Sequence, residues 1–375
     1  MKIAVLKDAG GDEARVAATP ETVGGYVKSG HQVNVVRGAG ASAHFSDDDY
    51  KAAGASLVAS NSAAAKSADL VMSVSGADKK LLSVMKKGSG ITGLLNPTDN
   101  PDYAAAAAKA GVTAYALEYV PRISRAQSMD VLSSQSNLSG YRAMVEAGTI
   151  YGRAFPMMMT AAGTVAPAKV FVMGAGVAGL QAIATARRLG AVTTATDVRP
   201  AAKEQVGSLG AKFIAVENEE FKEAETAGGY AKQMSAEYQK LQAELTAAHI
   251  AKQDIVITTA LIPGRPAPRL IDKRMVAAMR AGSVIVDMAV ERGGNVEGAK
   301  PGQIVETKNG VKIVGLLNWP SRMASDASNM FARNLRNLLP LMTAEDGSYA
   351  PDWDDEIIQA CALTRDGKVV HERLK

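Results

Sequence analysis

The feature that most constrains the fold is a regular alternation of short apolar segments with Ala-rich segments that end in glycine. The intervening segments, such as residues 20–30 and 100–111, begin with Pro or Asn and end with Gly, as helices do. Strands that alternate with helices in this way predict parallel sheets covered on both faces. The first series of predicted strands comprises residues 2–8, 31–38, 68–75, 89–96 and 112–120. The second series comprises residues 168–176, 191–198, 211–217, 253–262, 282–290 and 311–318.

Two such series predict two domains. A chain of 375 residues is too long for one ordinary core. Long helices predicted near 134–153 and after residue 318 would carry the chain into and out of the second domain. We therefore predict an α/β protein with two doubly wound, Rossmann-like domains joined by long helices. The expected N-terminal domain is residues 1–135 plus about 325–375, and the expected second domain is residues 136–324.

One segment departs from the alternation. Residues 217–252 are long and highly charged, and they contain a Gly-Gly-Tyr sequence near the middle. We predict a mobile loop over this range, and a kinked surface helix is the alternative.

Composition excludes several classes of function. The chain is 47% hydrophobic and 21% charged, and its net charge of +4 includes no long run of Lys and Arg, which argues against nucleic-acid binding. Cys361 is the single cysteine, so no internal disulfide forms and a cytoplasmic, reducing compartment is expected. The most apolar region, residues 154–180, is interrupted by Pro156, Pro167 and Lys169. We therefore expect no direct insertion into a membrane.

The strongest local motif is a dinucleotide-binding fingerprint. Gly174, Gly176 and Gly179 form G-x-G-x-x-G directly after a predicted strand and before a predicted helix, and Asp197 closes the next strand. The first glycine permits a tight turn, the second lets the backbone approach a pyrophosphate, and the third lets helix and strand pack closely. The helix N-terminus favours the phosphate charge. The motif alone is a weak signal, but strand, helix and acid in register predict a dinucleotide site.

Asp197 also predicts which nucleotide is bound. A carboxylate at this strand end accepts hydrogen bonds from the ribose hydroxyls of adenosine and repels a 2′-phosphate. Arg199 follows two residues later and tempers this repulsion without removing it. The alternative is that Asp197 is a solvated residue at a strand end. We predict NAD(H) rather than NADP(H).

The chain lacks groups that most dehydrogenases need. Oxidation of an alcohol or amine requires a proton acceptor, usually His, Lys or Tyr. None of the four histidines follows a predicted strand of the second domain, where a nicotinamide ring would lie, and no Cys/His cluster indicates a metal site. These histidines are His31, His44, His249 and His371. Hydride transfer between two nicotinamides needs no proton acceptor, which makes this absence informative.

Five segments together closely resemble the NAD(H)-binding component of proton-translocating nicotinamide nucleotide transhydrogenase, which is its soluble α-subunit or domain I. They are residues 122–143, 174–191, 196–213, 225–232 and 258–268. The resemblance implies direct hydride transfer from NADH to NADP⁺ held by a separate NADP(H)-binding β-subunit (domain III), coupled to proton movement through membrane-spanning subunits. It also implies a homodimer that is peripheral to the cytoplasmic face of the inner membrane.

The resemblance assigns roles in the Ser- and Gln-rich segment, residues 122–142. Gln127 and Ser133 would hydrogen-bond the nicotinamide carboxamide, and Arg122 and Asp130 would form a linked polar pair that shapes the segment. The alternative is a Ser-rich helix N-cap and nothing more. Catalytic roles are therefore predicted for Arg122, Gln127, Asp130 and Ser133. Cofactor contacts are predicted for Arg122, Ile123, Ser124, Arg125, Gln127, Ser133, Gly174, Gly176, Val177, Gly179, Asp197, Val198, Arg199, Gly229, Tyr230 and Leu261.

The resemblance also names the rival functions. Alanine dehydrogenases share the stretch Arg15–Pro20, but they keep a substrate-binding Lys and a catalytic His where this chain has Ser75 and Asn96. Their acid after the fifth strand corresponds to Glu291. With two of three groups replaced, amino-acid oxidation is disfavoured. An inert NAD-binding sensor or adaptor is the other alternative, and only one dinucleotide fingerprint is present, so a second nucleotide would belong to a partner.

Overall fold

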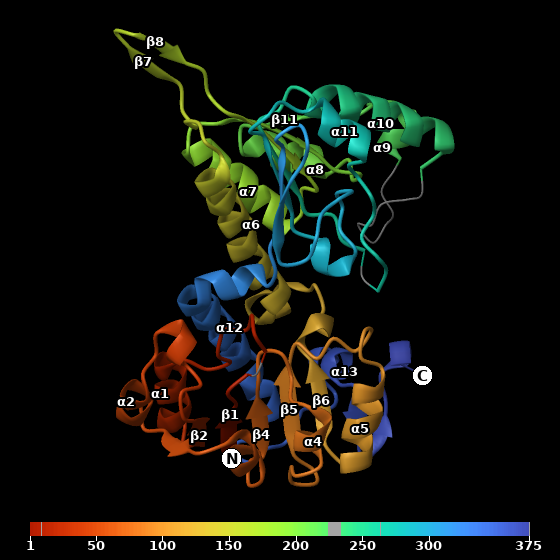
Figure 1. The fold of residues 1–375 in the computed structure, drawn as a ribbon. Helices are drawn as coiled ribbons and strands as arrows, with labels where there is room; N and C mark the ends of the chain where they lie inside the picture. The colour runs from red at the N-terminus through yellow and green to blue at the C-terminus, as the bar shows by residue number, and fades with distance from the viewer. Residues whose placement is uncertain (9, 224–233, 263, 375) are drawn as a thin grey trace. The chain divides into compact units, whose positions relative to one another are not determined.

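The computed structural model describes residues 1–8, 10–223, 234–262 and 264–374, and the chain divides into two compact units. Unit 1 contains Met1–Gln135 and Pro320–Lys375, and unit 2 contains Ser136–Trp319. Within unit 1 the C-terminal residues return to lie among the N-terminal elements (Figure 1). This return begins at Pro320 rather than near 325, because Ser321 already hydrogen-bonds residues of the N-terminal segment.

Unit 1 is built on a six-stranded parallel sheet with the order β3-β2-β1-β4-β5-β6. The central strand pairs on both sides, with Ile3 opposite Val33 and Leu70. These apolar runs form strands because both faces of the sheet are covered, and Ile3, Val33 and Leu70 are buried. The strands are β1 (Lys2–Val5), β2 (Gln32–Val36), β3 (Ser56–Val58), β4 (Leu70–Met72), β5 (Gly90–Gly93) and β6 (Thr113–Ala116), with a small hairpin of β16 (Thr364–Arg365) and β17 (Lys368–Val369).

The helices of unit 1 include two from the C-terminal segment, and α13 lies beside β6 (Figure 1). The α-helices are α1 (Pro20–Lys28), α2 (Asp47–Ala52), α3 (Asn61–Ala65), α4 (Lys79–Leu82), α5 (Asp102–Ala110), α12 (Ala324–Leu338) and α13 (Glu356–Cys361). The 3₁₀ helices are η1 (Ala41–Ala43), η2 (Leu117–Tyr119), η3 (Ser124–Met129), η6 (Leu339–Met342) and η7 (Glu372–Leu374). Two elements cross the unit boundaries, α6 (Val131–Ile150) and η5 (Trp319–Met323).

Unit 2 is built on a seven-stranded sheet with the order β11-β10-β9-β12-β13-β15-β14. The strands are parallel except β14, which runs antiparallel to β15 at one edge. The strands of unit 2 are β7 (Met158–Thr160), β8 (Gly163–Val165), β9 (Lys169–Met173), β10 (Val192–Thr196), β11 (Lys212–Phe213), β12 (Ile255–Thr258), β13 (Val284–Asp287), β14 (Gln303–Glu306) and β15 (Lys312–Gly315). Its helices are α7 (Val177–Arg188), α8 (Ala202–Ser208), α9 (Glu219–Lys222), α10 (Ala236–Ile250), α11 (Lys273–Ala278) and the 3₁₀ helix η4 (Val290–Arg292). The prediction of two doubly wound parallel sheets is confirmed.

Alternating residues of β9 show that helices cover both faces of this sheet. Val170 and Val172 pack in a cluster with residues of α7. Phe171 and Met173 pack in a second cluster with residues of α10 and α11. A side-chain period of two in a strand buried on both faces produces this division.

Six strands were not predicted from the sequence, namely β3, β7, β8, β14, β16 and β17. The edge strand β3 is short, and β7 and β8 form a hairpin within the apolar region before β9. Figure 1 shows this hairpin extending away from the rest of unit 2. The side chains of Met157 and Met159 are 60% and 78% exposed. Among the described residues, no helix is both long enough and apolar enough to span a membrane.

The segment predicted as a mobile loop, residues 217–252, is largely helical where it is described. Ser235 caps α10 by accepting a hydrogen bond from the backbone N–H of Tyr238, and Tyr238 and Ile250 are buried. A capped helix with a buried face is stabilised by that packing, so the prediction of a loop was wrong for residues 236–250.

Candidate functional site

The turn after β9 has the geometry that the fingerprint predicts. Gly174 has φ of +102°, a conformation that favours glycine. A Cβ on Gly179 would lie 1.8 Å from the backbone oxygen of Gly174, so a larger residue would separate α7 from β9. A Cβ on Gly176 would meet nothing within 4 Å, which leaves open space over the middle of the turn. The three glycines therefore have different roles. Gly174 allows the turn, Gly179 allows close packing of α7 on β9, and of the three only Gly176 lies next to space that a ligand could occupy.

The N-terminus of α7 faces this turn without a capping side chain. Its N-cap residue is Gly176, which has no side chain to accept a hydrogen bond from the first turn. The backbone N–H groups of a first helical turn have no partner within the helix and carry partial positive charge. In a glycine-rich turn after a strand, that arrangement suits a phosphate group.

Asp197 lies just after β10 and contacts the same turn. Its Oδ2 accepts a hydrogen bond from the backbone N–H of Ala175 at 2.7 Å. Its Oδ1 accepts from the backbone N–H and Nε of Arg199, both at 2.9 Å, and Nη2 of Arg199 donates to Oδ2 at 3.1 Å. The structure therefore brings Asp197, Arg199 and the glycine turn together. Because a carboxylate offers about four acceptor positions, Arg199 occupies positions that ribose hydroxyls would need.

The other predicted contacts of unit 2 lie on exposed residues. Val177, Val198 and Leu261 are 40%, 57% and 55% exposed, and large apolar side chains of this kind commonly line nucleotide sites. Gly229 and Tyr230 lie outside the described residues.

Asn295 is a residue of this site that the sequence analysis missed. Its Oδ1 accepts from the N–H of Ala260, and its Nδ2 donates to the carbonyl oxygens of Ala260 and Pro268 at 2.9 and 2.8 Å. Asn295 is fully buried and holds the chain that follows β12. The available signal was an Asn after two glycines, close to the end of a central strand.

Residues 122–135 of the Ser- and Gln-rich segment belong to unit 1 and form η3 and the start of α6, and residues 136–142 continue α6 in unit 2. Asp130 accepts hydrogen bonds from the backbone N–H and Oγ of Ser133 at 2.9 and 2.6 Å, which caps α6. The carboxylate is turned toward the helix start, and no ion pair joins it to Arg122 among the described residues, so the link between Arg122 and Asp130 stays a prediction. Arg122, Ser124 and Gln127 are exposed, and Ile123 is half-buried.

Arg125 holds η3 to the C-terminal segment. Its Nη1 and Nη2 donate to the two carboxylate oxygens of Asp355 at 2.7 and 3.0 Å, and Nη2 also lies 3.3 Å from Glu356. The hydrogen bonds from Arg125 lower the pKa of Asp355. The predicted cofactor contact of Arg125 therefore falls on a guanidinium that is already paired within unit 1.

Comparison with known proteins assigns the family. Residues 4–139 match the alanine dehydrogenase/PNT N-terminal domain, and residues 143–372 match the alanine dehydrogenase/PNT C-terminal domain. An NAD(P) transhydrogenase alpha subunit of Rhodospirillum rubrum is 52% identical over 382 residues, which cover 100% of this chain and 99% of the relative. The chain belongs to the NAD(P) transhydrogenase alpha-subunit family.

Two further relatives show the breadth of this similarity. The crystal structure of transhydrogenase from Sinorhizobium meliloti has a TM-score of 0.89 at 51% identity, covering 99% of this chain and 100% of that chain. Alanine dehydrogenase of Mycobacterium tuberculosis is 30% identical over 310 residues, covering 80% of this chain and 76% of the relative.

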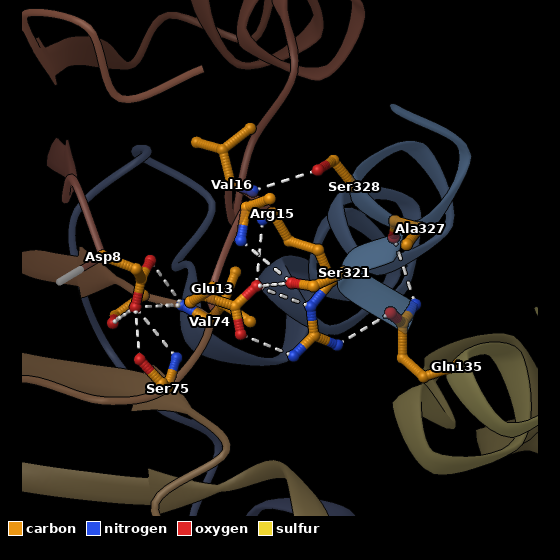
Figure 2. A network of polar contacts seen from close by, with 12 residues as sticks. Asp8, Glu13, Arg15, Val16, Val74, Ser75, Gln135, Ser321, Ala327 and Ser328 are labelled. Carbon is orange, nitrogen blue, oxygen red and sulfur yellow. Dashed lines mark hydrogen bonds and ion pairs between the residues drawn. The ribbon is translucent and has the colours of Figure 1, made fainter. Parts of the chain in front are cut away.

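The stretch shared with alanine dehydrogenases, Arg15–Pro20, lies in unit 1, where the guanidinium of Arg15 is buried and paired. Its Nε and Nη2 donate to the carboxylate of Glu13 at 2.8 and 2.7 Å, and Nη1 donates to Oε1 of Gln135 at 2.9 Å (Figure 2). Ser321 donates to the same carboxylate. Arg15 and Glu13 side chains are 6% and 7% exposed, so this is a buried internal ion pair.

Ser75 and Asn96 are likewise bound within unit 1. Ser75 donates from Oγ and from its backbone N–H to Oδ1 of Asp8, both at 2.9 Å (Figure 2). Asn96 has φ of +47°, and its N–H donates to Glu118. Glu291 lies on η4 in unit 2 and is exposed. Arg15, Ser75 and the backbone of Asn96 are therefore each engaged within unit 1, whereas Glu291 is exposed.

Proposed function

We propose that this chain is the NAD(H)-binding component of a proton-translocating transhydrogenase. On this proposal it holds NADH while hydride passes directly to NADP⁺ on a separate NADP(H)-binding β-subunit. Membrane-spanning subunits would couple that transfer to proton movement. The observation that carries the proposal is the open glycine turn at the N-terminus of α7, beside Asp197, in a chain of this family.

The described residues of unit 2 fit an NAD(H) dinucleotide. The uncapped first turn of α7 and the space over Gly176 suit the pyrophosphate. Asp197 would accept hydrogen bonds from the adenosine ribose once the Arg199 side chain moves aside, and Val198 and Leu261 would flank the adenosine. A buried carboxylate at the ribose disfavours a 2′-phosphate, which supports NAD(H) over NADP(H) on this chain.

In the proposal, Gln127 and Ser133 orient the nicotinamide ring by hydrogen bonds to its carboxamide, while Arg122 and Asp130 shape the segment. When bound, NADH supplies the hydride, and no proton is exchanged with the protein in that step. Reacting atoms about 3–3.5 Å apart with aligned faces are the main requirement for such a transfer. The exposed amide of Gln127 on η3 and the half-buried hydroxyl of Ser133 at the start of α6 would supply orientation without acid or base chemistry.

The proposal includes a second copy of this chain and a peripheral position on the cytoplasmic face of the inner membrane. The hairpin β7–β8 supports the homodimer because Met157, Met158 and Met159 expose apolar side chains to solvent. Such a patch is more often an interface than a free surface. Sedimentation velocity of the isolated chain tests the homodimer.

Reconstitution with the NADP(H)-binding subunit tests the function. The wild-type pair should transfer hydride from NADH to NADP⁺, and the chain alone should not. Gln127→Asn should lower the single-turnover rate about a hundredfold, because a slightly misaligned ring reacts slowly. The same change should shift the NADH dissociation constant by less than about tenfold, the size of one neutral hydrogen bond. Equal losses of rate and affinity would make Gln127 a simple binding contact.

A further inference from the structure

Two side chains of helix α12 donate hydrogen bonds to one backbone oxygen of the Ser- and Gln-rich segment. Nδ2 of Asn334 donates to the carbonyl oxygen of Ser128 at 2.8 Å, and Nδ2 of Asn337 donates to the same oxygen at 3.0 Å. Residues three apart lie on the same face of a helix, so one side of α12 presents both amides to η3. Ser128 directly follows Gln127 in that 3₁₀ helix.

Asn334 also reaches the start of α6. Its Oδ1 accepts a hydrogen bond from Oγ of Ser134 at 2.7 Å. The Asn334 side chain is buried, and one amide therefore ties α12 both to the η3 backbone and to the first turn of α6. Gln127 directly precedes Ser128 and Ser133 directly precedes Ser134, so each residue is next to one end of the link.

We propose that Asn334 is a positioning residue for the hydride step, because it fixes the backbone that carries Gln127 and Ser133. This inference rests on the proposed function. A hydrogen bond between neutral groups contributes little to stability. Its loss has a larger effect on hydride transfer, because a displacement of the reacting atoms by about 1 Å slows such a step about a hundredfold.

Asn334→Asp separates the two ends of the link. Aspartate still accepts from Ser134 but cannot donate to the Ser128 carbonyl, and its charge opposes that oxygen. We expect single-turnover hydride transfer to fall by about a hundredfold. We expect the NADH dissociation constant, measured on the variant chain without its partner, to change by less than about tenfold. The fluorescence of bound NADH should also change, because the environment of the ring differs.

Two other variants complete the experiment. Arg333→Ala is the matched control, since Arg333 lies next to Asn334 on α12 and, in the part of the chain that the structure describes, pairs with exposed Glu21; its rate should equal that of the wild type. Asn337→Ala removes the exposed second donor to Ser128 without a change in the core, and it should slow the hydride step less than Asn334→Asp does.

The outcomes are distinct. If the wild-type pair transfers no hydride, the proposed function fails. If the wild-type pair is active and Asn334→Asp matches its rate, or loses rate and NADH affinity in equal proportion, the positioning role is wrong. Should Asn334→Asp fail to fold, an unchanged rate in Asn337→Ala overturns the inference, and a slower rate at unchanged NADH affinity supports it.

Discussion

In unit 2 the strand β9 passes into α7 through a glycine turn, whereas in unit 1 the strand β1 is separated from α1 by residues 6–19. The helix α7 starts at Gly176 with no capping side chain. The helix α1 follows Thr19, whose backbone N–H donates to the hydroxyl of Thr22, and its first residue, Pro20, has no N–H to satisfy. The connection in unit 2 is thus a tight glycine turn directly before its helix, and the connection in unit 1 is a longer segment.

The ends of the central strands differ in charge as well. In each sheet the order of strands switches from one side of the first strand to the other, between β1 and β4 in unit 1 and between β9 and β12 in unit 2. Open α/β sheets usually bind ligands at such a switch point. In unit 2, Thr259 after β12 donates to the Gly174 oxygen at 3.0 Å. In unit 1, the Asp8 carboxylate accepts from Ser73 and Ser75 after β4. Burial raises the pKa of Asp8, and the hydrogen bonds from Val74, Ser73 and Ser75 offset some of that rise.

The comparison teaches that strand order alone does not make a nucleotide site. An open glycine turn with free N–H groups attracts a phosphate, and a carboxylate at the corresponding strand end does not. Unit 1 instead uses its polar groups to hold its own segments together, as the Arg15–Glu13 pair shows.

The largest effect is expected from Arg15→Met, which tests whether the unit 1 site is structural. Removing one partner of a buried ion pair should lower the free energy of unfolding by about 3–5 kcal/mol. NADH affinity should not change. Urea unfolding and a fluorescence titration with NADH measure the two quantities, with exposed Arg37→Met as the control. A stable Arg15→Met variant that no longer binds NADH would break the comparison.

The same pair has a defined pH dependence. Burial alone would raise the pKa of Glu13, but hydrogen bonds and charge from Arg15, with a hydrogen bond from Ser321, lower it overall. Because the folded pKa is the lower one, this contribution to stability is complete above the ordinary value of 4.5 and is lost as the pH falls through the folded pKa. The wild type should therefore lose more stability than Arg15→Met on acidification.

The next effect concerns nucleotide choice in unit 2. Asp197→Ala should weaken NADH binding by about tenfold or more, because hydrogen bonds to a charged group contribute about 1.5–3 kcal/mol. It should weaken NADPH binding less, because the repulsion of the 2′-phosphate is gone and Arg199 is released. Titrations with both nucleotides give the ratio. Asp8→Asn removes the corresponding charge from unit 1 and should leave the ratio unchanged; an unchanged ratio in Asp197→Ala itself means the ribose assignment is wrong.

Gly179→Ala tests the close contact of the glycine turn. The added Cβ meets the Gly174 oxygen, and overpacking of this kind costs about 1–3 kcal/mol. Stability and NADH affinity should both fall. Gly176→Ala has open space around it and should reduce affinity while leaving urea unfolding unchanged. Gly11→Ala, which also has open space but lies in the unit 1 connection, should change neither. If Gly176→Ala keeps the full affinity for NADH, the pyrophosphate does not bind at this turn.

The last prediction is that the purified chain does not oxidise L-alanine. Addition of L-alanine and NAD⁺ to the purified chain should produce no NADH above a heat-inactivated sample, because Ser75 and Asn96 replace the groups that this chemistry needs. Absorbance at the NADH band is sufficient. Turnover of L-alanine would show that unit 1 has a substrate site despite the Arg15–Glu13 pair.

The sequence by itself determined the two parallel sheets, because buried strands are continuous apolar runs separated by helices with local start and stop signals. It also determined the glycine fingerprint and the acid after β10, since these depend on residues close together in the chain. Short edge strands such as β3 and β14 carry too few apolar residues for this signal.

Only the tertiary structure decided how the polar side chains are paired. Asp130 caps α6, Arg199 covers Asp197, and Asn334 reaches Ser128 across 206 residues of sequence. Each side chain had several possible partners of suitable chemistry. A hydrogen bond requires a donor and an acceptor within about 3 Å and in line. That distance is set by how the helices and strands pack, which no local pattern of residues contains.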